Sequence, residues 1–281
     1  MSIQNSSITR ILKEYGIHPD KSLGQNFLTN PTIIKKITAI AEIQKQDTVL
    51  EIGAGIGHLT FELAALSSRV VAVELDDRLI PVLREFTSEL DNVEIIHGDI
   101  LELDLKRLSL PHAYLVVANI PYYITSILIR RLSETSHPPE RMVLTVQREV
   151  AERMCQEPGK LNLLAISVQV YGEPSIRDHI PAGAFYPPPD VDSTVIRVDR
   201  YPEPLIPAEH LKLFFRLAKA GFSQKRKTLR NSISGGMGWE PKDTGKLLVE
   251  TGLDPSRRAE TLSIQEWYQL TLITKHLLGV E

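Results

Sequence analysis

Short apolar runs alternate with helical patterns along the first 200 residues, and this alternation restricts the possible folds more than any other feature of the sequence. The runs "DTVLEIG" (47–53) and "RVVAVEL" (69–75) are typical of buried strands. A helical pattern precedes them in "NPTIIKKITAIAEI" (30–43), with Asn30 as the expected N-cap and Pro31 at the first helical position. This order predicts an α/β fold, with a mostly parallel sheet and helices on both faces.

The same alternation continues to about residue 200. Further strands are expected at 92–99, 113–123, 141–147, 163–172 and 193–200. The last two are expected to pair as an antiparallel hairpin at one edge of the sheet. Helices are expected at 57–67, 76–90, 124–134 and 148–155.

A proline-rich stretch, "YPEPLIP" (201–207), marks the expected domain boundary, because neither a helix nor a central strand tolerates three prolines. Helices are predicted beyond it at 208–233, 243–252 and 263–278. From Leu205 onward the formal net charge is +4, against −7 for the preceding residues, so basic charge is concentrated at the C-terminal end. The expected division is an N-terminal extension (1–30), a catalytic α/β domain (31–201) and a small all-helical C-terminal domain (208–281).

Composition excludes several classes of protein. Hydrophobic residues make up 42% of the chain and charged residues 24%, as in ordinary globular proteins. No apolar stretch approaches the roughly 20 residues that span a membrane, and no signal-peptide pattern is present, so we expect no membrane partner. The lone Cys155 allows no internal disulfide, which favours a cytoplasmic location. Neither Cys155 nor the histidines have metal-ligand spacing, so no metal is expected.

Three glycines follow the strand in "VLEIGAGIGHLT" (49–60). Gly53, Gly55 and Gly57 would let the backbone pass close to a ligand at the start of a helix. A dinucleotide fingerprint needs a small residue where His58 stands, which disfavours a nicotinamide oxidoreductase. The spacing G-x-G-x-G instead resembles the S-adenosylmethionine loop of class I methyltransferases.

Acidic residues end the next two expected strands. Glu74 could accept hydrogen bonds from both ribose hydroxyls of a nucleoside, and Asp99 lies within reach of an adenine amine. Each residue alone is commonly a helix cap or turn residue. Polar groups at successive carboxyl ends are nevertheless where an open α/β sheet binds its ligand, so the sequence predicts a nucleoside site.

The motif "NIPY" (119–122) ends the fourth expected strand with chemistry suited to a planar amine. Asn119 can offer its side-chain oxygen, and Ile120 its backbone carbonyl, held extended because Pro121 follows. Two such acceptors would draw an aromatic amine toward tetrahedral geometry and free its lone pair. Tyr122 could stack on the ring, which is worth about 1–3 kcal/mol per base. The motif therefore predicts methyl transfer to an amine such as adenine N6.

Two further motifs indicate a nucleic-acid substrate. In "FYPPPDVDS" (185–193) the prolines make a stiff loop that could hold Phe185 against the second face of a flipped base, although a rigid connector would show the same pattern. The segment "SQKRKTLRN" (223–231) is expected to place basic residues at one helix start, where they would contact RNA phosphates or simply face solvent. These residues are Lys225, Arg226, Lys227 and Arg230.

Five motifs in order, "GQNFL" (24–28), "EIGAGIG" (51–57), "NIPY", "FYPPPDVDS" and "FSQKRKTLRN" (222–231), resemble the small-subunit rRNA adenine N6-dimethyltransferases over nearly the whole chain. The resemblance implies a class I S-adenosylmethionine-dependent methyltransferase fold. It also implies that the N-terminal extension contributes to the cofactor and RNA site. The cofactor contacts that it implies are Asn26, Leu28, Gly53, Glu74, Asp99 and Asn119.

The resemblance further implies the substrate, two adjacent adenosines near the 3′ end of 16S rRNA in an assembling small subunit, each dimethylated at N6 with S-adenosylhomocysteine as product. We expect a monomer. Two departures are mild, because Asn26 stands where histidine is common and Ile120 where leucine is common. Only the resemblance indicates two methyl groups rather than one.

Other functions stay open on the sequence alone. The large-subunit adenine methyltransferases of the macrolide-resistance type share the NIPY-type motif, but "PPDVDS" (188–193) lacks the lysine that they tend to carry after the second proline. A ribosome-assembly or RNA-binding factor with little turnover would keep the same fold. Methylation of DNA or of a protein glutamine also fits the NIPY motif.

Overall fold

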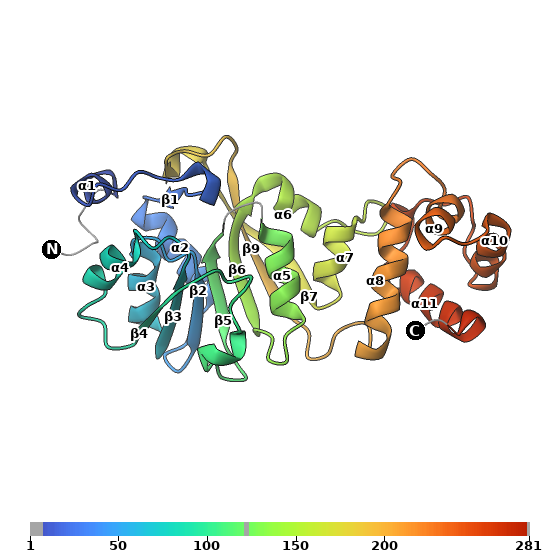
Figure 1. The fold of residues 1–281 in the computed structure, drawn as a ribbon, viewed down its shortest axis with the longest axis horizontal. Helices are drawn as coiled ribbons and strands as arrows, with labels where there is room; N and C mark the ends of the chain where they lie inside the picture. The colour runs from blue at the N-terminus through green and yellow to red at the C-terminus, as the bar shows by residue number, and fades with distance from the viewer. Residues whose placement is uncertain (1–7, 121–123, 280–281) are drawn as a thin grey trace. The chain divides into compact units, whose positions relative to one another are not determined.

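The computed structural model of the 281-residue chain describes residues 8–120 and 124–279 (Figure 1). It contains two compact units, Met1–Ala151 with Pro174–Arg200, and Glu152–Glu173 with Tyr201–Glu281. The second unit thus includes a segment that the sequence analysis placed in the catalytic domain. Within the described ranges, no helix is long and apolar enough to cross a membrane.

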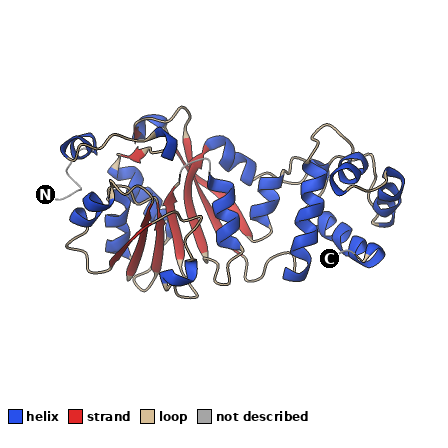
Figure 2. Ribbon diagram, viewed as in Figure 1, coloured by secondary structure: helices blue, strands red, loops and turns tan. Residues whose placement is uncertain are grey.

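A seven-stranded sheet forms the centre of the first unit, with the strand order β4-β3-β2-β5-β6-β9-β7. The strands are labelled in Figure 1 and drawn in red in Figure 2. The five neighbouring strands β4, β3, β2, β5 and β6 pair in parallel, and β9 runs antiparallel to β6. The expected mostly parallel sheet with an antiparallel edge is confirmed. The strands are β2 (Thr48–Ile52), β3 (Arg69–Glu74), β4 (Val93–His97), β5 (Leu115–Asn119), β6 (Arg141–Gln147), β7 (Gly172–Ile180) and β9 (Ser193–Arg200).

Helices connect these strands, largely where the sequence predicts them. Asn30 caps the first of them, since its side-chain oxygen accepts a hydrogen bond from the Thr32 amide at 2.9 Å. The helices are α2 (Pro31–Ala41), α3 (His58–Leu66), α4 (Ile80–Phe86), α5 (Thr125–Ser133) and α6 (Arg148–Met154). A short 3-10 helix, η3 (Leu105–Leu108), lies between β4 and β5.

Both faces of the sheet are covered. Neighbouring residues of a strand point to opposite faces, yet Val49 and Leu50 on β2 are both fully buried, as are Val116 and Val117 on β5. Such strands appear in sequence as continuous apolar runs, which is why they could be recognised.

The expected strand at 163–172 is wrong. Residues Leu163–Gln169 form helix α7, which begins where the Asn162 side chain accepts a hydrogen bond from the Ala165 amide at 3.1 Å. A short, uninterrupted apolar run does not distinguish a buried helix from a buried strand. The strand at this edge of the sheet is instead β7. It is a polar stretch that carries Pro174, and a proline is tolerated in an edge strand.

The N-terminal segment joins the first unit through a second, two-stranded sheet. Strand β1 (Phe27–Leu28) pairs antiparallel with β8 (Phe185–Tyr186), so that Leu28 lies opposite Phe185. The Thr29 amide also donates to the Ala184 carbonyl at 3.0 Å. Helix α1 (Ile8–Glu14) and the 3-10 helix η2 (Lys21–Leu23) precede this sheet.

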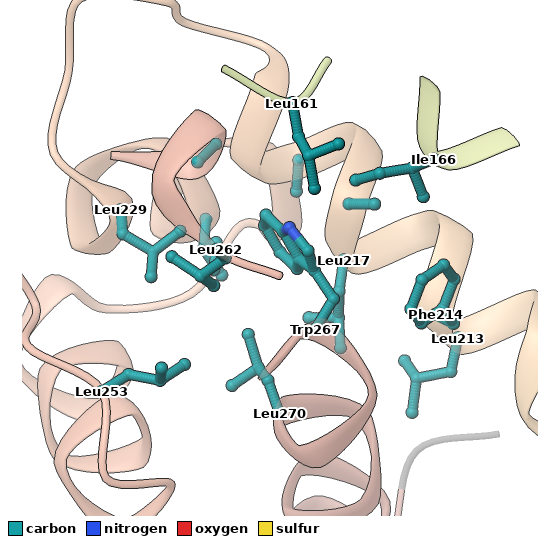
Figure 3. Packing of buried hydrophobic residues seen from close by; sticks show 14 of the residues in the cluster. Leu161, Ile166, Leu213, Phe214, Leu217, Leu229, Leu253, Leu262, Trp267 and Leu270 are labelled. Atoms are coloured by element: carbon teal, nitrogen blue, oxygen red, sulfur yellow. The ribbon is translucent and has the colours of Figure 1, made fainter. Parts of the chain in front are cut away.

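Four helices follow in the second unit, namely α8 (Ala208–Phe222), α9 (Leu229–Met237), α10 (Pro241–Glu250) and α11 (Ile264–Leu278). The single helix expected over 208–233 is therefore two helices. Trp267 is fully buried among leucines from several of these elements (Figure 3). A Cβ at Gly221 of α8 would lie 2.3 Å from the Trp267 ring, so only glycine lets the indole approach this helix.

Candidate active site

One cavity of the first unit collects the carboxyl ends of four neighbouring strands. In sheet order, Asp99 follows β4, Glu74 ends β3, Gly53 follows β2 and Asn119 ends β5, and all four line this cavity. The sequence analysis expected polar groups at successive strand ends to meet in this way. The structure brings them together, and we call this space the strand-end cavity.

The glycine loop has the backbone that its sequence requires. Gly53, Gly55 and Gly57 have φ angles of +75°, +61° and +94°, a region that favours glycine. A Cβ at Gly53 would lie 3.2 Å from the Asn119 carbonyl oxygen, and one at Gly55 would lie 3.3 Å from the Phe27 ring. Gly53 and Gly55 line the strand-end cavity, whereas Gly57 lies outside its lining and is the N-cap of α3.

Glu74 is held by three backbone amides. Its Oε2 accepts from Gly55 at 2.6 Å, and its Oε1 accepts from Leu75 and Asp76 at 2.9 Å each. Burial raises the pKa of the Glu74 carboxyl, and these amide donors counteract that rise. A carboxylate has about four acceptor positions, so roughly one stays open for a ligand hydroxyl. The two hydrogen bonds from ribose hydroxyls that the sequence analysis expected would therefore have to share the Glu74 oxygens with the three backbone amides.

Asp99 lies in the loop after β4. Its Oδ1 accepts from the Leu101 amide at 2.8 Å, and its carbonyl accepts from the Glu102 and Leu103 amides. These bonds fix the turn. Within the described ranges no hydrogen bond uses Oδ2, which leaves that oxygen as an acceptor for a ligand amine.

Asn119 is tied to the N-terminal segment. Its Nδ2 donates to the Asn26 carbonyl at 2.9 Å, so the amide group has its donor side engaged and keeps Oδ1 as an acceptor. Asn26 also lines the strand-end cavity. Leu28, by contrast, is buried in the core beside Phe185 and lines only a smaller adjoining cavity.

The acceptor motif is described only in part. Ile120 lines the strand-end cavity and is buried, as its expected role through the backbone carbonyl allows. The expected roles of Pro121 and Tyr122 lie outside the described residues.

Phe185 was expected to present its ring to the second face of a flipped base, but its ring is buried. Its side chain is only 4% exposed and belongs to the hydrophobic core with Leu28, Ala184 and Val195. Tyr186, next to it on β8, is 37% exposed. Alternate residues of a strand face opposite ways, so the loop directs one aromatic ring inward and the other outward. In this arrangement a base could stack on Phe185 only after the loop moves.

The basic residues of "SQKRKTLRN" are all exposed in the second unit, but only one lies on a helix. Lys225, Arg226 and Lys227 occupy the turn between α8 and α9, and Arg230 lies in the first turn of α9. The expectation that all four share one helix start is wrong. Polar Ser223 and Gln224 and the N-cap Thr228 interrupt the apolar periodicity there.

Sequence reasoning missed Gln25 as part of the site. Its Nε2 donates to Asp76 Oδ2 at 2.6 Å, and its Oε1 accepts from the Asp20 amide at 2.7 Å. Arg78 in turn holds Asp76 and lowers the pKa of that carboxyl. Gln25 thus joins the N-terminal segment to the loop after β3. Its place in the motif "GQNFL" was the available signal.

Glu51 was also missed. This carboxyl lies on β2, is 1% exposed and lines the smaller cavity beside Gly53 and Asn119. Neither oxygen has a hydrogen-bond partner in the described part of the chain. Thr60 is a polar neighbour, but no hydrogen bond joins the two side chains. Burial raises the pKa of Glu51 to about 8.

Residues 18–275 match the family model of ribosomal RNA adenine dimethylase. The chain is 42% identical over 266 residues to ribosomal RNA small subunit methyltransferase A of Dehalococcoides mccartyi, an alignment that covers 94% of this chain and 91% of the relative. It is also 42% identical over 276 residues to the protein of the same name from Enterococcus faecalis, covering 95% and 94%.

Two solved structures share the fold. A dimethyladenosine transferase from Plasmodium falciparum is 26% identical, with a TM-score of 0.77, covering 89% of this chain and 98% of that one. The 23S rRNA methyltransferase ErmE is also 26% identical, with a TM-score of 0.69 and coverage of 88% and 99%. The resemblance inferred from the motifs is confirmed, and the chain belongs to the ribosomal RNA adenine dimethylase family.

Proposed function

We propose that this chain transfers methyl groups from S-adenosylmethionine to N6 of two adjacent adenosines near the 3′ end of small-subunit rRNA, giving N6,N6-dimethyladenosine. The observation that carries the proposal is the meeting of Asp99, Glu74, Gly53 and Asn119 in one cavity. The small-subunit relatives at 42% identity over more than nine-tenths of the chain support the choice of RNA.

The lining of the strand-end cavity suits a nucleoside. Glu74 and Asp99 each keep an acceptor position for a hydroxyl or an amine, and the glycine loop lets the backbone approach the ligand. Bound S-adenosylmethionine would supply an electrophilic methyl group, S-adenosylhomocysteine would remain, and the methylated nitrogen would lose its proton to water. The residues proposed to hold it are Asn26, Leu28, Gly53, Gly55, Gly57, Glu74, Asp99 and Asn119.

The acceptor amine would be held where β5 ends. Asn119 would accept one N–H of the adenine amine through Oδ1, because its Nδ2 already donates to Asn26. The Ile120 carbonyl would accept the other N–H, with Pro121 fixing its direction and Tyr122 stacked on the ring. Phe185, after a movement of its loop, would cover the second face. Holding the amine in line with the methyl group would supply most of the rate acceleration.

RNA contacts are proposed for the exposed basic residues of the second unit. Lys225, Arg226, Lys227 and Arg230 would neutralise backbone phosphates and thereby position the RNA without selecting its sequence. We further propose that the substrate is an assembling small-subunit particle in the cytoplasm and that the protein acts as a monomer. The scheme that we propose uses no metal.

The test offers three acceptors with methyl-labelled S-adenosylmethionine: small-subunit particles lacking the modification, large-subunit RNA, and DNA. Label on the particles, found by mass spectrometry as two dimethylated adenosines, is the expected result. Label only on large-subunit RNA would instead favour the activity named for ErmE. Absence of label on every acceptor, with intact RNA binding, would indicate an assembly factor with little turnover.

A further inference from the structure

A second cavity of the first unit lies at the other end of β5, where the strand begins. Tyr114 lines this cavity and directly precedes β5, whereas Asn119 ends β5 in the strand-end cavity. Five residues of extended chain span about 16 Å. The second cavity measures about 540 Å³ and shares no lining residue with the first. We call it the amino-edge cavity.

Arg131 of α5 brings a positive charge to this cavity without a counter-ion. One guanidinium nitrogen, Nη2, donates to the Leu103 carbonyl, but Nε is buried and has no hydrogen-bond partner among the described residues. In the described part of the chain, no carboxylate lies within ion-pairing distance of Arg131. Leaving a charged guanidinium incompletely paired is unfavourable, so Arg131, which lines the cavity, is suited to an acceptor supplied from outside the chain.

Tyr114 supplies a second unused donor. Tyr114 is only 2% exposed, and no described residue forms a hydrogen bond with its hydroxyl, which is not one of the fully buried polar atoms. The hydroxyl can therefore donate to a ligand in the cavity that Tyr114 lines. Burial also raises the pKa of Tyr114, so the hydroxyl stays protonated and can donate.

Among the other lining residues, Lys106 adds an exposed ammonium group. The Thr135 hydroxyl already donates to the Leu132 carbonyl at 3.2 Å, and the Ser136 hydroxyl pairs with Nδ1 of His137 at 3.1 Å. The one carboxylate in the lining, Asp104, already accepts from the Lys106 amide and lies 3.7 Å from Arg107. The fitting ligand therefore presents several acceptor oxygens and negative charge. A phosphate group has this chemistry, and a guanidinium is its usual partner.

We propose that the amino-edge cavity binds a phosphate group, with Arg131 and Tyr114 as its donors and the exposed Lys106 and His137 at its rim. The phosphate can come from a free nucleotide or from an RNA backbone, and both present the same oxygens. This site is separate from the strand-end cavity and does not depend on the methyl-transfer proposal.

The test measures binding of three probes to the full-length protein by calorimetry: inorganic phosphate, adenosine 5′-monophosphate and a short single-stranded RNA. Sodium chloride at matched ionic strength controls for screening. We expect saturable phosphate binding that is at least about fivefold weaker in Tyr114→Phe and about tenfold weaker in Arg131→Gln. Arg84→Gln removes an exposed arginine from α4 and should leave this binding unchanged.

Weaker phosphate binding in Tyr114→Phe could not be attributed to misfolding. This variant removes a hydroxyl that has no partner among the described residues, so its melting temperature should be unchanged or higher. If RNA is the source, both variants weaken RNA binding and phosphate competes with RNA. If a nucleotide is the source, RNA binding is unaffected while monophosphate binding weakens. The proposal is overturned if phosphate binds no more tightly than roughly 20 mM and RNA binding is unchanged, or if both variants bind phosphate like the wild type.

Discussion

The side-chain amide of Asn119 donates to the backbone carbonyl of Asn26 at 2.9 Å, and this bond joins the end of a central strand to the N-terminal segment. Two parts of the chain that are 93 residues apart thereby form one wall of the strand-end cavity. Because the bond occupies Nδ2, it also determines which atom of the amide stays available to an acceptor amine.

Asn119→Ala is expected to reduce methyl transfer by about 10²–10³-fold, because one of the two proposed acceptors for the amine is lost. Cofactor affinity should fall less, since Glu74 and Asp99 remain. Single-turnover transfer to small-subunit particles and calorimetry with the cofactor measure the two effects. Asn92→Ala is the matched control, because Asn92 also donates to backbone carbonyls but lies just before β4, away from the cavity. Retained turnover in Asn119→Ala would show that the amine is held elsewhere.

Glu74→Gln is expected to weaken cofactor binding by about tenfold or more, because charge-assisted hydrogen bonds are replaced by a neutral amide whose NH2 opposes backbone donors. Calorimetry with S-adenosylmethionine and S-adenosylhomocysteine measures the change. Glu94→Gln serves as control, since Glu94 on β4 pairs with Arg69 outside the cavity. Equal affinities in wild type and Glu74→Gln would exclude the proposed ribose contact.

Glu51 is expected to make stability depend on pH. Burial raises its pKa to about 8, so the folded protein holds this proton more tightly than the unfolded chain, whose carboxyl titrates near 4.5. The contribution of Glu51 to stability is full below about pH 4.5 and is lost as the pH rises to about 8. Glu51→Gln should therefore gain stability relative to wild type by on the order of 1–3 kcal/mol between pH 5 and pH 8.

Urea unfolding at several pH values, without cofactor, measures this difference. The exposed Glu89 offers the control Glu89→Gln, which should follow the wild type at every pH. A constant difference between Glu51→Gln and wild type across this range would show that Glu51 is ionised in the folded protein.

Gly221→Ala is expected to destabilise the protein by about 1–3 kcal/mol, because the new Cβ would lie 2.3 Å from the Trp267 ring in the packed core of the second unit. Gly245→Ala on α10 is the matched control. Its Cβ would meet Arg230 at 3.4 Å, an ordinary contact, so alanine should be neutral or stabilising by up to about 1 kcal/mol. Thermal unfolding followed by Trp fluorescence measures both variants, and equal stability would contradict the packing argument.

Arg226→Ala is expected to weaken RNA binding and to lower the slope of its salt dependence by about 1, because one phosphate contact is lost. Cofactor affinity should stay unchanged. Lys246→Ala, which removes a cation close to Asp243 on α10, should show neither effect. If Arg226→Ala binds RNA like the wild type at every salt concentration, the basic turn is an ordinary solvent-exposed segment.

Local chemistry made much of this fold predictable. Asn30 and Pro31 start α2 through capping and a fixed backbone angle, and both effects depend only on neighbouring residues. Gly53 and Glu74 could be placed at strand ends because buried parallel strands give continuous apolar runs that stop abruptly. The predictions failed where local chemistry is ambiguous, as at Leu163–Gln169, whose apolar run fits a buried helix as well as a strand.

The sequence by itself determined the order of elements, the glycine loop, the chemical types of the site residues and, through its motifs, the family. Only the tertiary structure decided which side chains face the site. Pairing between β1 and β8 buries Phe185 and exposes Tyr186, a choice of strand register that composition does not specify. Tertiary packing likewise decided the burial of Glu51 and the engagement of Asn119 by Asn26, since such contacts join residues far apart in the chain.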